Sequence, residues 1–275
     1  MQHERSWWAQ KSLLPVFLVI MLPVLSAGCS SGAGRVTVFA AAGTKPAIDE
    51  ACDSFKDQYG SDVEVIYGGG GEVLARMISL ERGDVYIAPE QEFMESAVQH
   101  EAVDPATIAT VAYMIPVLAV QKGNPKGIAG LSDLARTDVR VALTRPETTL
   151  LGKYAREIFQ KAGLADEIEA NVVTEAARPD IAVTMVTMGQ VDATITWHFY
   201  RSVAPDELDV VWLDPDELTG IGEMQIAVSI YTRQRDAADR FVDFIASDEG
   251  KAVFERHGYI VRADEAKKYW PSVEQ

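Results

Sequence analysis

From residue 35 onward, the chain alternates between short β-branched or aromatic runs and segments with helical periodicity. Residues 35–41 form the first apolar run, and a turn at Gly43 and Thr44 follows it. Apolar side chains then recur at the spacing of one helix face, at Ile48, Ala51, Cys52 and Phe55. Strand, small-residue turn and helix repeat in this order, which is the pattern of an α/β fold with mostly parallel strands.

Two sets of such units follow one another along the sequence. In the first set we expect strands at residues 35–41, 63–67, 84–88 and 113–121, with helices after Pro46 and at 72–81 and 89–99. In the second set we expect strands at 139–143, 171–174, 193–197 and 210–213, with helices at 150–162 and 179–188. The final stretch predicts a strand at 225–231 and helices at 237–247 and 250–257.

Residues 1–28 differ in character from the rest of the chain. Basic residues precede an uncharged apolar run at 13–25, and a Gly-Cys junction follows it. This order is typical of an export signal, and the run is shorter than the ~20 apolar residues of a membrane-spanning helix. The junction resembles a bacterial lipoprotein signal, so we expect loss of residues 1–28, lipid modification of Cys29 and a flexible tether over residues 29–34. A plain secretory signal with a chance cysteine is the alternative.

Composition and motifs exclude several classes of protein. The formal net charge is -16, from 25 Lys+Arg against 41 Asp+Glu, whereas nucleic-acid binders display a basic face. The two cysteines lack the spacing of a zinc site or a disulfide framework, and Cys52 is expected in the core of its helix. The only Gly-x-Ser-x-Gly match, at residues 28–32, ends the export signal and does not join a strand to a helix, and no His-Glu-x-x-His helix occurs. We therefore expect no enzyme, no cofactor, no resident metal and no nucleic-acid partner.

Four of the expected turns precede helices and consist of small, hydroxyl-bearing or basic residues. They lie at Gly43 and Thr44, at residues 68–71, at Thr148 and Thr149, and at residues 177–179. Ligands of open α/β sheets bind beyond the carboxyl ends of the strands, and helix N-termini attract anions through their N–H groups. The turns therefore predict a site for a compact oxyanion. The alternative is that they are ordinary turn glycines and N-caps.

Five segments also carry a family resemblance. They are Val-Phe-Ala-Ala-Ala at 38–42, Leu-Ala-Arg-Met-Ile at 74–78, Asp-Val-Tyr-Ile-Ala at 84–88, Pro-Glu-Thr-Thr-Leu-Leu-Gly-Lys-Tyr-Ala at 146–155, and Ser-Asp-Glu-Gly-Lys-Ala-Val-Phe-Glu-Arg-His-Gly-Tyr at 247–259. In this order they resemble the molybdate/tungstate-type substrate-binding proteins of ABC importers. The resemblance implies a type II periplasmic-binding-protein fold, with two parallel-rich sheets and a ligand cleft between two lobes.

The same resemblance implies the domain organisation and the function. Lobe I would comprise residues 35–115 and 224–275, lobe II residues 116–223, and the two crossings would form a hinge that closes on the ligand. The chain would act as a monomer outside the cytoplasm, in the periplasm or at the cell surface, anchored to the membrane through Cys29. It would deliver a molybdate- or tungstate-like oxyanion to an ABC permease. The implied ligand-binding residues are Gly43, Thr44, Gly70, Gly71, Glu72, Thr148, Thr149, Leu151, Arg178 and Trp197.

The resemblance also marks where this chain departs from its pattern. The family places serine hydroxyls at the position of Gly43 and in the turn of Gly70 and Gly71, and a tyrosine near Trp197. Thr44, backbone N–H groups and the indole N–H of Trp197 are the candidate replacements.

Several alternatives stay open from the sequence alone. Glu72, Glu147, His198 and Tyr200 are hard-metal ligands that a ferric-ion binder would use. A small organic acid is another candidate ligand, and a sensor would use the same clamp without transport. Glu72 either lies favourably in a helix first turn or contacts the ligand. Arg178 either makes a bidentate contact with an anion or is solvated.

Overall fold

The computed structural model describes residues 35–273. The predicted signal peptide at residues 1–28, the predicted lipidation site Cys29 and the tether at 29–34 lie outside these residues. Within residues 35–273, no helix combines the length and the apolar character needed to cross a membrane.

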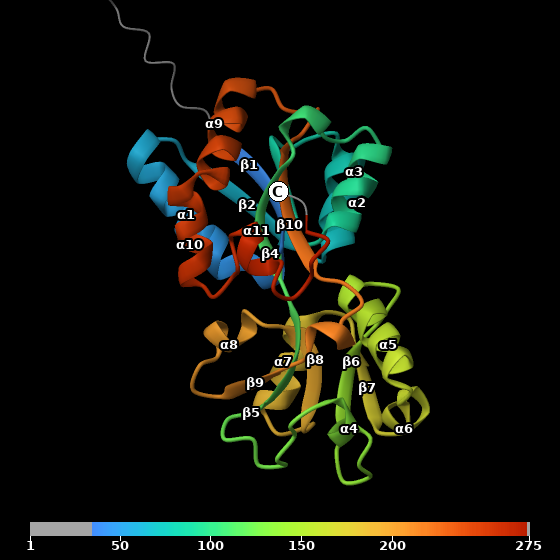
Figure 1. The fold of residues 1–275 in the computed structure, drawn as a ribbon. Coiled ribbons are helices and arrows are strands. Elements are labelled where there is room, and N and C mark those ends of the chain that lie inside the picture. The colour runs from blue at the N-terminus through green and yellow to red at the C-terminus, as the bar shows by residue number, and fades with distance from the viewer. Residues whose placement is uncertain (1–34, 274–275) are drawn as a thin grey trace, which may run out of the picture. The chain divides into compact units, whose positions relative to one another are not determined.

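Two five-stranded mixed sheets form the framework of the described residues (Figure 1). The first sheet has the order β2-β1-β3-β10-β4 and the second has the order β7-β6-β8-β5-β9. The strands of the first sheet are β1 (Val36–Ala41), β2 (Val63–Gly68), β3 (Val85–Ala88), β4 (Ala109–Met114) and β10 (Gly222–Val228). Those of the second are β5 (Pro116–Gln121), β6 (Val141–Thr144), β7 (Val172–Ala176), β8 (Ala193–Trp197) and β9 (Leu208–Trp212).

The predicted α/β fold with two sheets is confirmed, and the strand directions refine it. Among the described residues, each sheet has two parallel and two antiparallel strand pairs, so parallel pairs do not dominate. The antiparallel pairs involve β5 and β10, the strands with which the chain enters a sheet from the other one. β5 and β10 each start at a crossing, whereas the strands beside them end near that crossing. β5 and β10 therefore run antiparallel to their neighbours.

One predicted strand, residues 113–121, proves to be two strands in different sheets. β4 ends at Met114 and β5 begins at Pro116, with Ile115 between them. Both strands are almost entirely buried, so the apolar run continues through the change of sheet without a visible break. Pro116 has no N–H to donate, and the first position of a strand tolerates this.

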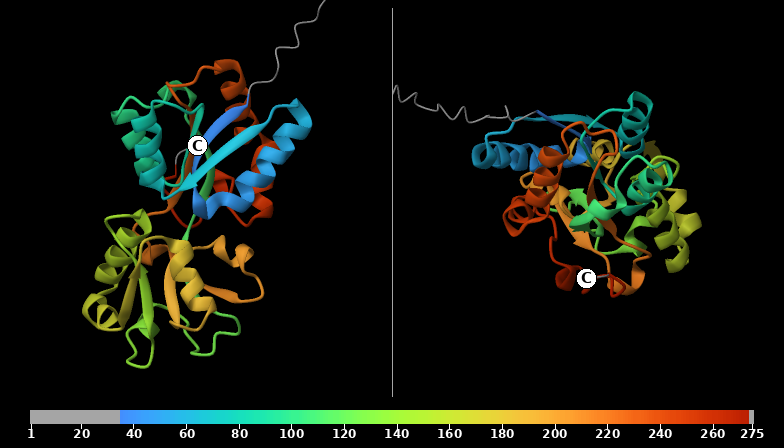
Figure 2. Two further views of the ribbon diagram at one scale, coloured as in Figure 1. Left: turned by 180° about the vertical axis from the view of Figure 1, so that it is seen from behind. Right: turned by 90° about the horizontal axis from the view of Figure 1, so that it is seen from above.

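Helices cover both faces of the first sheet (Figures 1 and 2). The helices α1 (Lys45–Tyr59), α9 (Arg235–Ala246) and α10 (Asp248–Arg256) pack on one face, and α2 (Gly70–Leu80) and α3 (Gln91–Gln99) on the other. In β1, Val38 and Ala40 belong to the cluster with α1, whereas Phe39 packs with Met77 of α2. This alternation follows from the period of two in a strand that is buried on both faces.

The second sheet carries α5 (Leu150–Ala162) and α7 (Pro179–Thr187). The remaining helices are short: α4 (Leu131–Leu134), α6 (Ala165–Glu169), α8 (Tyr200–Val203) and α11 (Ala263–Ala266). The sequence did not predict them, because segments this short show no helical periodicity.

Side chains hold the two segments where the chain passes between the sheets. At the first crossing, the N–H of Ile115 donates to Nδ1 of His198 at 3.0 Å. At the second, Gln91 accepts from the N–H of Glu223 at 3.0 Å and donates to the carbonyl of Ile221 at 3.3 Å. His198 directly follows β8 and Gln91 begins α3, so each crossing is tied to an element beside the sheet ends.

The first core cluster generates a stability prediction. Phe55 is fully buried, and its ring centroid lies 5.0 Å from that of Phe241 and 5.5 Å from that of Phe244. We expect Phe55→Ala to lower the free energy of unfolding by about 3–5 kcal/mol, because it leaves a cavity among these rings. Urea unfolding followed by circular dichroism measures this. Leu80→Ala, at an exposed helix end, is the control and should change stability by less than about 0.5 kcal/mol; equal losses would contradict the assignment.

Candidate functional site

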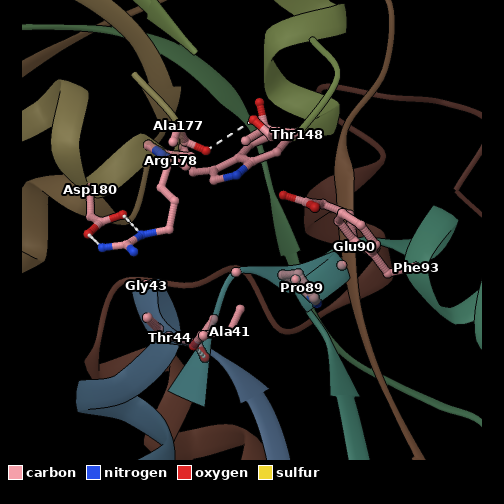
Figure 3. Close-up of a pocket in the computed structure, with 18 of the residues that line it drawn as sticks. Ala41, Gly43, Thr44, Pro89, Glu90, Phe93, Thr148, Ala177, Arg178 and Asp180 are labelled. Carbon is pink, nitrogen blue, oxygen red and sulfur yellow. Dashed lines mark hydrogen bonds and ion pairs between the residues drawn. The ribbon is translucent and has the colours of Figure 1, made fainter. Parts of the chain in front are cut away.

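A cavity of about 410 Å³ lies where strands of both sheets end (Figure 3). Residues that follow β1, β2 and β3 line one side, and residues that follow β6, β7 and β8 line the other. The first group is Ala41, Ala42, Gly43, Thr44, Gly68, Gly69, Gly70, Gly71, Glu72, Pro89, Glu90 and Phe93, with Met114 of β4. The second group is Glu147, Thr148, Thr149, Ala177, Arg178, Pro179, Asp180, Trp197, Phe199 and Tyr200. The carboxyl ends of strands thus meet at one opening, as expected for ligand sites in α/β sheets.

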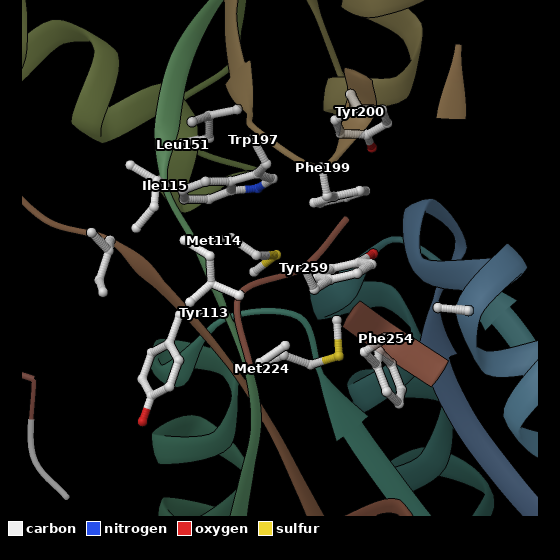
Figure 4. Packing of buried hydrophobic residues seen from close by; sticks show 14 of the residues in the cluster. Tyr113, Met114, Ile115, Leu151, Trp197, Phe199, Tyr200, Met224, Phe254 and Tyr259 are labelled. Atoms are coloured by element: carbon white, nitrogen blue, oxygen red, sulfur yellow. The ribbon is translucent and has the colours of Figure 1, made fainter. Parts of the chain in front are cut away.

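All predicted ligand-binding residues except Leu151 line this cavity. Leu151 is fully buried, and its side chain belongs to the hydrophobic cluster drawn in Figure 4. Leu151 lies in the first turn of α5, so its backbone stays a predicted ligand contact although its side chain does not line the cavity. The ligand contacts of the other residues stay predictions.

Helix N-termini surround the cavity. α2 begins at Gly70, α5 at Leu150 and α7 at Pro179, and a short 3-10 turn at Ala42–Thr44 leads into α1. The first N–H groups of a helix have no partner within it, and the helix dipole adds about half a positive charge there. The cavity therefore brings together helix N-termini that follow strands of both sheets.

The threonine hydroxyls predicted as ligand donors already bond to the protein. Thr44 donates to the carbonyl of Ala41 at 2.7 Å, and Thr148 contacts the carbonyl of Ala177 at 3.1 Å. The Oγ1 atom of Thr149 accepts from the N–H of Gly152 at 3.0 Å and so caps α5. A hydroxyl has a single proton to donate, so in this arrangement the hydroxyls of Thr44 and Thr148 have none left for a ligand.

Tyr200 occupies the space in front of Gly43. A Cβ atom built on Gly43 would lie 2.7 Å from the Tyr200 hydroxyl oxygen, closer than side chains approach. Burial raises the pKa of Tyr200, so its hydroxyl stays protonated and can donate. The hydroxyl that the family resemblance places on residue 43 is therefore replaced in space by a phenol from α8, a substitution that the sequence could not reveal.

Gly70 is also fixed by its surroundings. A Cβ atom there would lie 2.8 Å from Pro89 and 2.9 Å from the ring of Phe93. The turn after β2 thus packs its backbone directly on the segment after β3. No serine side chain fits at this position without moving Phe93.

The charged side chains of the cavity differ in their hydrogen-bond partners and in their exposure to solvent. Arg178 makes a bidentate contact with Asp180, with distances of 3.0 and 2.9 Å, so much of its charge is neutralised within the protein. Glu72 is exposed and accepts from the N–H of Gly69 at 3.1 Å, which supports the interpretation of a favourable carboxylate in a helix first turn. Glu147 is exposed at the rim.

Glu90 is the one cavity carboxyl that is buried, with 5% of the residue exposed. Burial raises its pKa to about 7, a hydrogen bond from Trp197 opposes this rise, and the charge of Glu92 adds to it. Sequence reasoning missed this residue. The available signal was its position two residues after the end of β3, at the same edge as the predicted turns.

The alternative metal set is not assembled. His198 is buried away from the cavity, its Nδ1 is engaged by Ile115, and burial lowers its pKa to about 4. Glu72, Glu147 and Tyr200 do line the cavity. Across residues 35–273, however, no three His, Cys, Asp or Glu residues gather in a way that could hold a metal ion. Cys52 is buried and unpaired, as predicted.

Comparison with known proteins identifies the family. The family model of bacterial extracellular solute-binding proteins matches residues 36–260. The chain belongs to this family. Its members are substrate-binding proteins and not enzymes.

Individual relatives agree with this assignment and show that the chain is ModA-like. The molybdate-binding protein ModA of Escherichia coli (strain K12) is 25% identical over 236 residues, which cover 83% of this chain and 90% of that protein. The sulfate-binding protein SubI of Mycobacterium tuberculosis H37Rv has a TM-score of 0.73 at 17% identity, covering 88% and 92% of the two chains. L-phospholactate-bound PEB3, a Campylobacter jejuni protein, has a TM-score of 0.71 at 18% identity, covering 83% and 100%.

The contact between Gly43 and Tyr200 generates a prediction. We expect Gly43→Ala to lower the melting temperature, because the new Cβ would clash with the Tyr200 hydroxyl at 2.7 Å. Adding Tyr200→Phe should recover most of the loss, since the nearest remaining ring atom lies at an ordinary 3.8 Å. Thermal unfolding of both single variants and the double variant forms a double-mutant cycle. Additive effects of the two changes would show that the residues do not touch.

Proposed function

We propose that this solute-binding protein captures a small oxyanion, molybdate- or tungstate-like, and delivers it to an ABC permease. The observation that carries the proposal is the convergence of helix N-termini from both sheets on one cavity. Such termini bind anions through N–H groups without a full countercharge. Relatives that bind molybdate and sulfate support this ligand class.

The net charge of -16 does not oppose this proposal. Exposed charges separated by more than about 8 Å are largely screened at physiological salt. The local N–H donors and helix dipoles therefore determine affinity, while the long-range field acts mainly on the rate of encounter.

An oxyanion carried by a small organic molecule is the second candidate. The cavity volume of about 410 Å³ lies in the range of roughly 300–1,000 Å³ that small organic ligands occupy. Its wall includes the apolar side chains of Phe93, Met114, Trp197 and Phe199, which a bare oxyanion would leave uncovered. The L-phospholactate complex of PEB3 is an example of this ligand class in a related fold.

We further propose that the chain closes on its ligand between lobe I, residues 35–115 and 224–275, and lobe II, residues 116–223. The two crossings near Ile115 and Ile221 would act as hinges. We expect export through the signal at residues 1–28 and anchoring by a lipid on Cys29. A sensor that uses the same closure without transport would differ only in its partner.

A ligand screen tests the ligand class. We expect one oxyanion per chain in calorimetry, and a rise in melting temperature of the native protein, because a ligand that binds only the folded state stabilises it by mass action. The panel contains molybdate, tungstate, sulfate, L-phospholactate, L-malate and ferric citrate. Small-angle scattering with the binding compound should show a smaller radius of gyration. Failure of all the oxyanions, with a response to ferric citrate alone, would refute the proposal.

Anchoring is tested by expression in a bacterial host. We expect the full chain to fractionate with membranes and to carry a lipid mass on Cys29 after loss of residues 1–28. Cys29→Ser should abolish the lipid and release the protein from the membrane, whereas Cys52→Ser, at the buried cysteine, should leave the anchor in place. A soluble, unmodified wild-type protein would instead indicate a plain secretory signal.

A further inference from the structure

Glu90 contributes a buried carboxyl group to a cavity built for anions. It follows β3 and Pro89, and Figure 3 shows its carboxyl group directed into the cavity. The residue is 5% exposed, in contrast to the exposed Glu72 and Glu147 at the same cavity. A carboxylate in this place would face any anion held by the helix N-termini, so its protonation state matters for binding.

We propose that Glu90 binds the ligand as a neutral carboxylic acid and donates its proton in a hydrogen bond to the anion, so that capture of a fully deprotonated anion takes up a proton. This inference rests on the proposed function, because it requires an anionic ligand in the cavity. It makes Glu90 a specificity-determining residue that the family resemblance does not assign.

The groups around Glu90 do not neutralise its charge. The indole of Trp197 donates a hydrogen bond to it, and in residues 35–273 no lysine or arginine pairs with it. The other titratable or charged groups that face it come from β3, α3, α5, α8 and the cavity wall. They are Tyr86, Glu92, Tyr154, Tyr200, Glu72, Glu147 and the Arg178–Asp180 pair. Most of these side chains are neutral or negative, and Arg178 is already paired. Glu90 is the N-cap of α3, whose N-terminus favours a carboxylate, but burial is the larger influence and raises the pKa of Glu90.

Two free energies determine whether Glu90 is protonated in the complex: the repulsion between its carboxylate and the anion, and the cost of protonating it. Two unit negative charges ~4 Å apart, at an effective dielectric constant of ~20, repel by an amount equal to roughly a thousand-fold in affinity. Because the pKa of Glu90 is about 7 in the empty site, protonating it at neutral pH weakens binding only about twofold. The anion therefore binds to the protonated form.

The direction of the pH dependence follows from this balance. The empty site loses its proton as the pH rises through 7, and the complex keeps it, so the fraction of protein ready to bind an anion falls with pH. Between about pH 6 and pH 8 this fraction drops about tenfold. A cationic ligand would behave in the opposite way, because it would select the ionised carboxylate and release a proton.

Calorimetry of the full mature chain with molybdate tests the proposal, with sulfate and L-malate as second and third probes. None of these three anions carries a proton above about pH 6, so any proton taken up belongs to the protein. We expect the dissociation constant to rise about tenfold from pH 6 to pH 8. Titrations in buffers of different ionisation enthalpy should show uptake of about half a proton at pH 7, rising toward one at higher pH.

Two matched variants test whether the proton taken up on binding is held by Glu90. Glu90→Gln keeps a hydrogen-bond donor and removes the charge, so it should bind the probe with no pH dependence and no proton uptake. Thermal unfolding checks that the Glu90→Gln variant folds. If the variant does not fold, the proton uptake measured with the wild-type protein still tests the proposal. Glu95→Gln makes the same change at an exposed position of α3 away from the cavity, and it should keep the tenfold pH dependence.

The outcomes separate this inference from the proposed function. A wild-type protein that binds a probe equally at pH 6 and pH 8, or that releases protons, would overturn the role of Glu90 and leave anion capture intact. Glu90→Gln with an unchanged pH dependence would do the same. If only tungstate or L-phospholactate binds, that anion becomes the probe for the same pH series. A wild-type protein that binds none of these five anions at any pH would overturn both proposals.

Discussion

The binding site depends on a geometric constraint, which is that strands followed by helices end together. β1, β2 and β3 of one sheet and β6, β7 and β8 of the other all end at the cavity, and their following turns bring helix N-termini to it. Unpaired N–H groups are costly when buried without a partner, so such a cluster is stable only beside water or a ligand. The convergence of helix N-termini at the cavity is thus a consequence of the way the two sheets are wound.

Local electrostatics, and not the overall charge, gives this cavity its character. Two of the charged groups at the cavity are compensated by near neighbours: Glu72 by the N–H of Gly69, and Arg178 by Asp180. Glu90 has no cationic partner among the described residues, and burial raises its pKa to about 7. A protein rich in acidic residues can therefore present a neutral, donor-lined cavity to an anion, with a single group whose charge responds to pH near neutrality.

The cavity lies next to the first segment where the chain passes between the two sheets. Trp197, Phe199 and Tyr200 reach the cavity from the second sheet, and the ring of Phe199 stacks on that of Tyr259 with centroids 4.2 Å apart (Figure 4). The bond from Ile115 to His198 lies beside the same segment. Residues that line the cavity are thus continuous with residues that hold a crossing.

The sequence by itself determined the fold class and most elements, because hydrophobic period and turn chemistry are local properties. Nine of the ten ligand-binding residues that the family resemblance implies also line the cavity. Gly43, Gly70 and Thr149 could be placed at the site from their positions before helices. Tertiary structure decided the rest. It divided one apolar run at Ile115 between two sheets, buried Leu151 and His198 away from the cavity, and brought Tyr200 against Gly43 and Trp197 against Glu90. These pairs lie more than a hundred residues apart or in different sheets, and neither residue carries a local signal of its partner. Burial, and with it the pKa of Glu90, exists only once the sheets have packed.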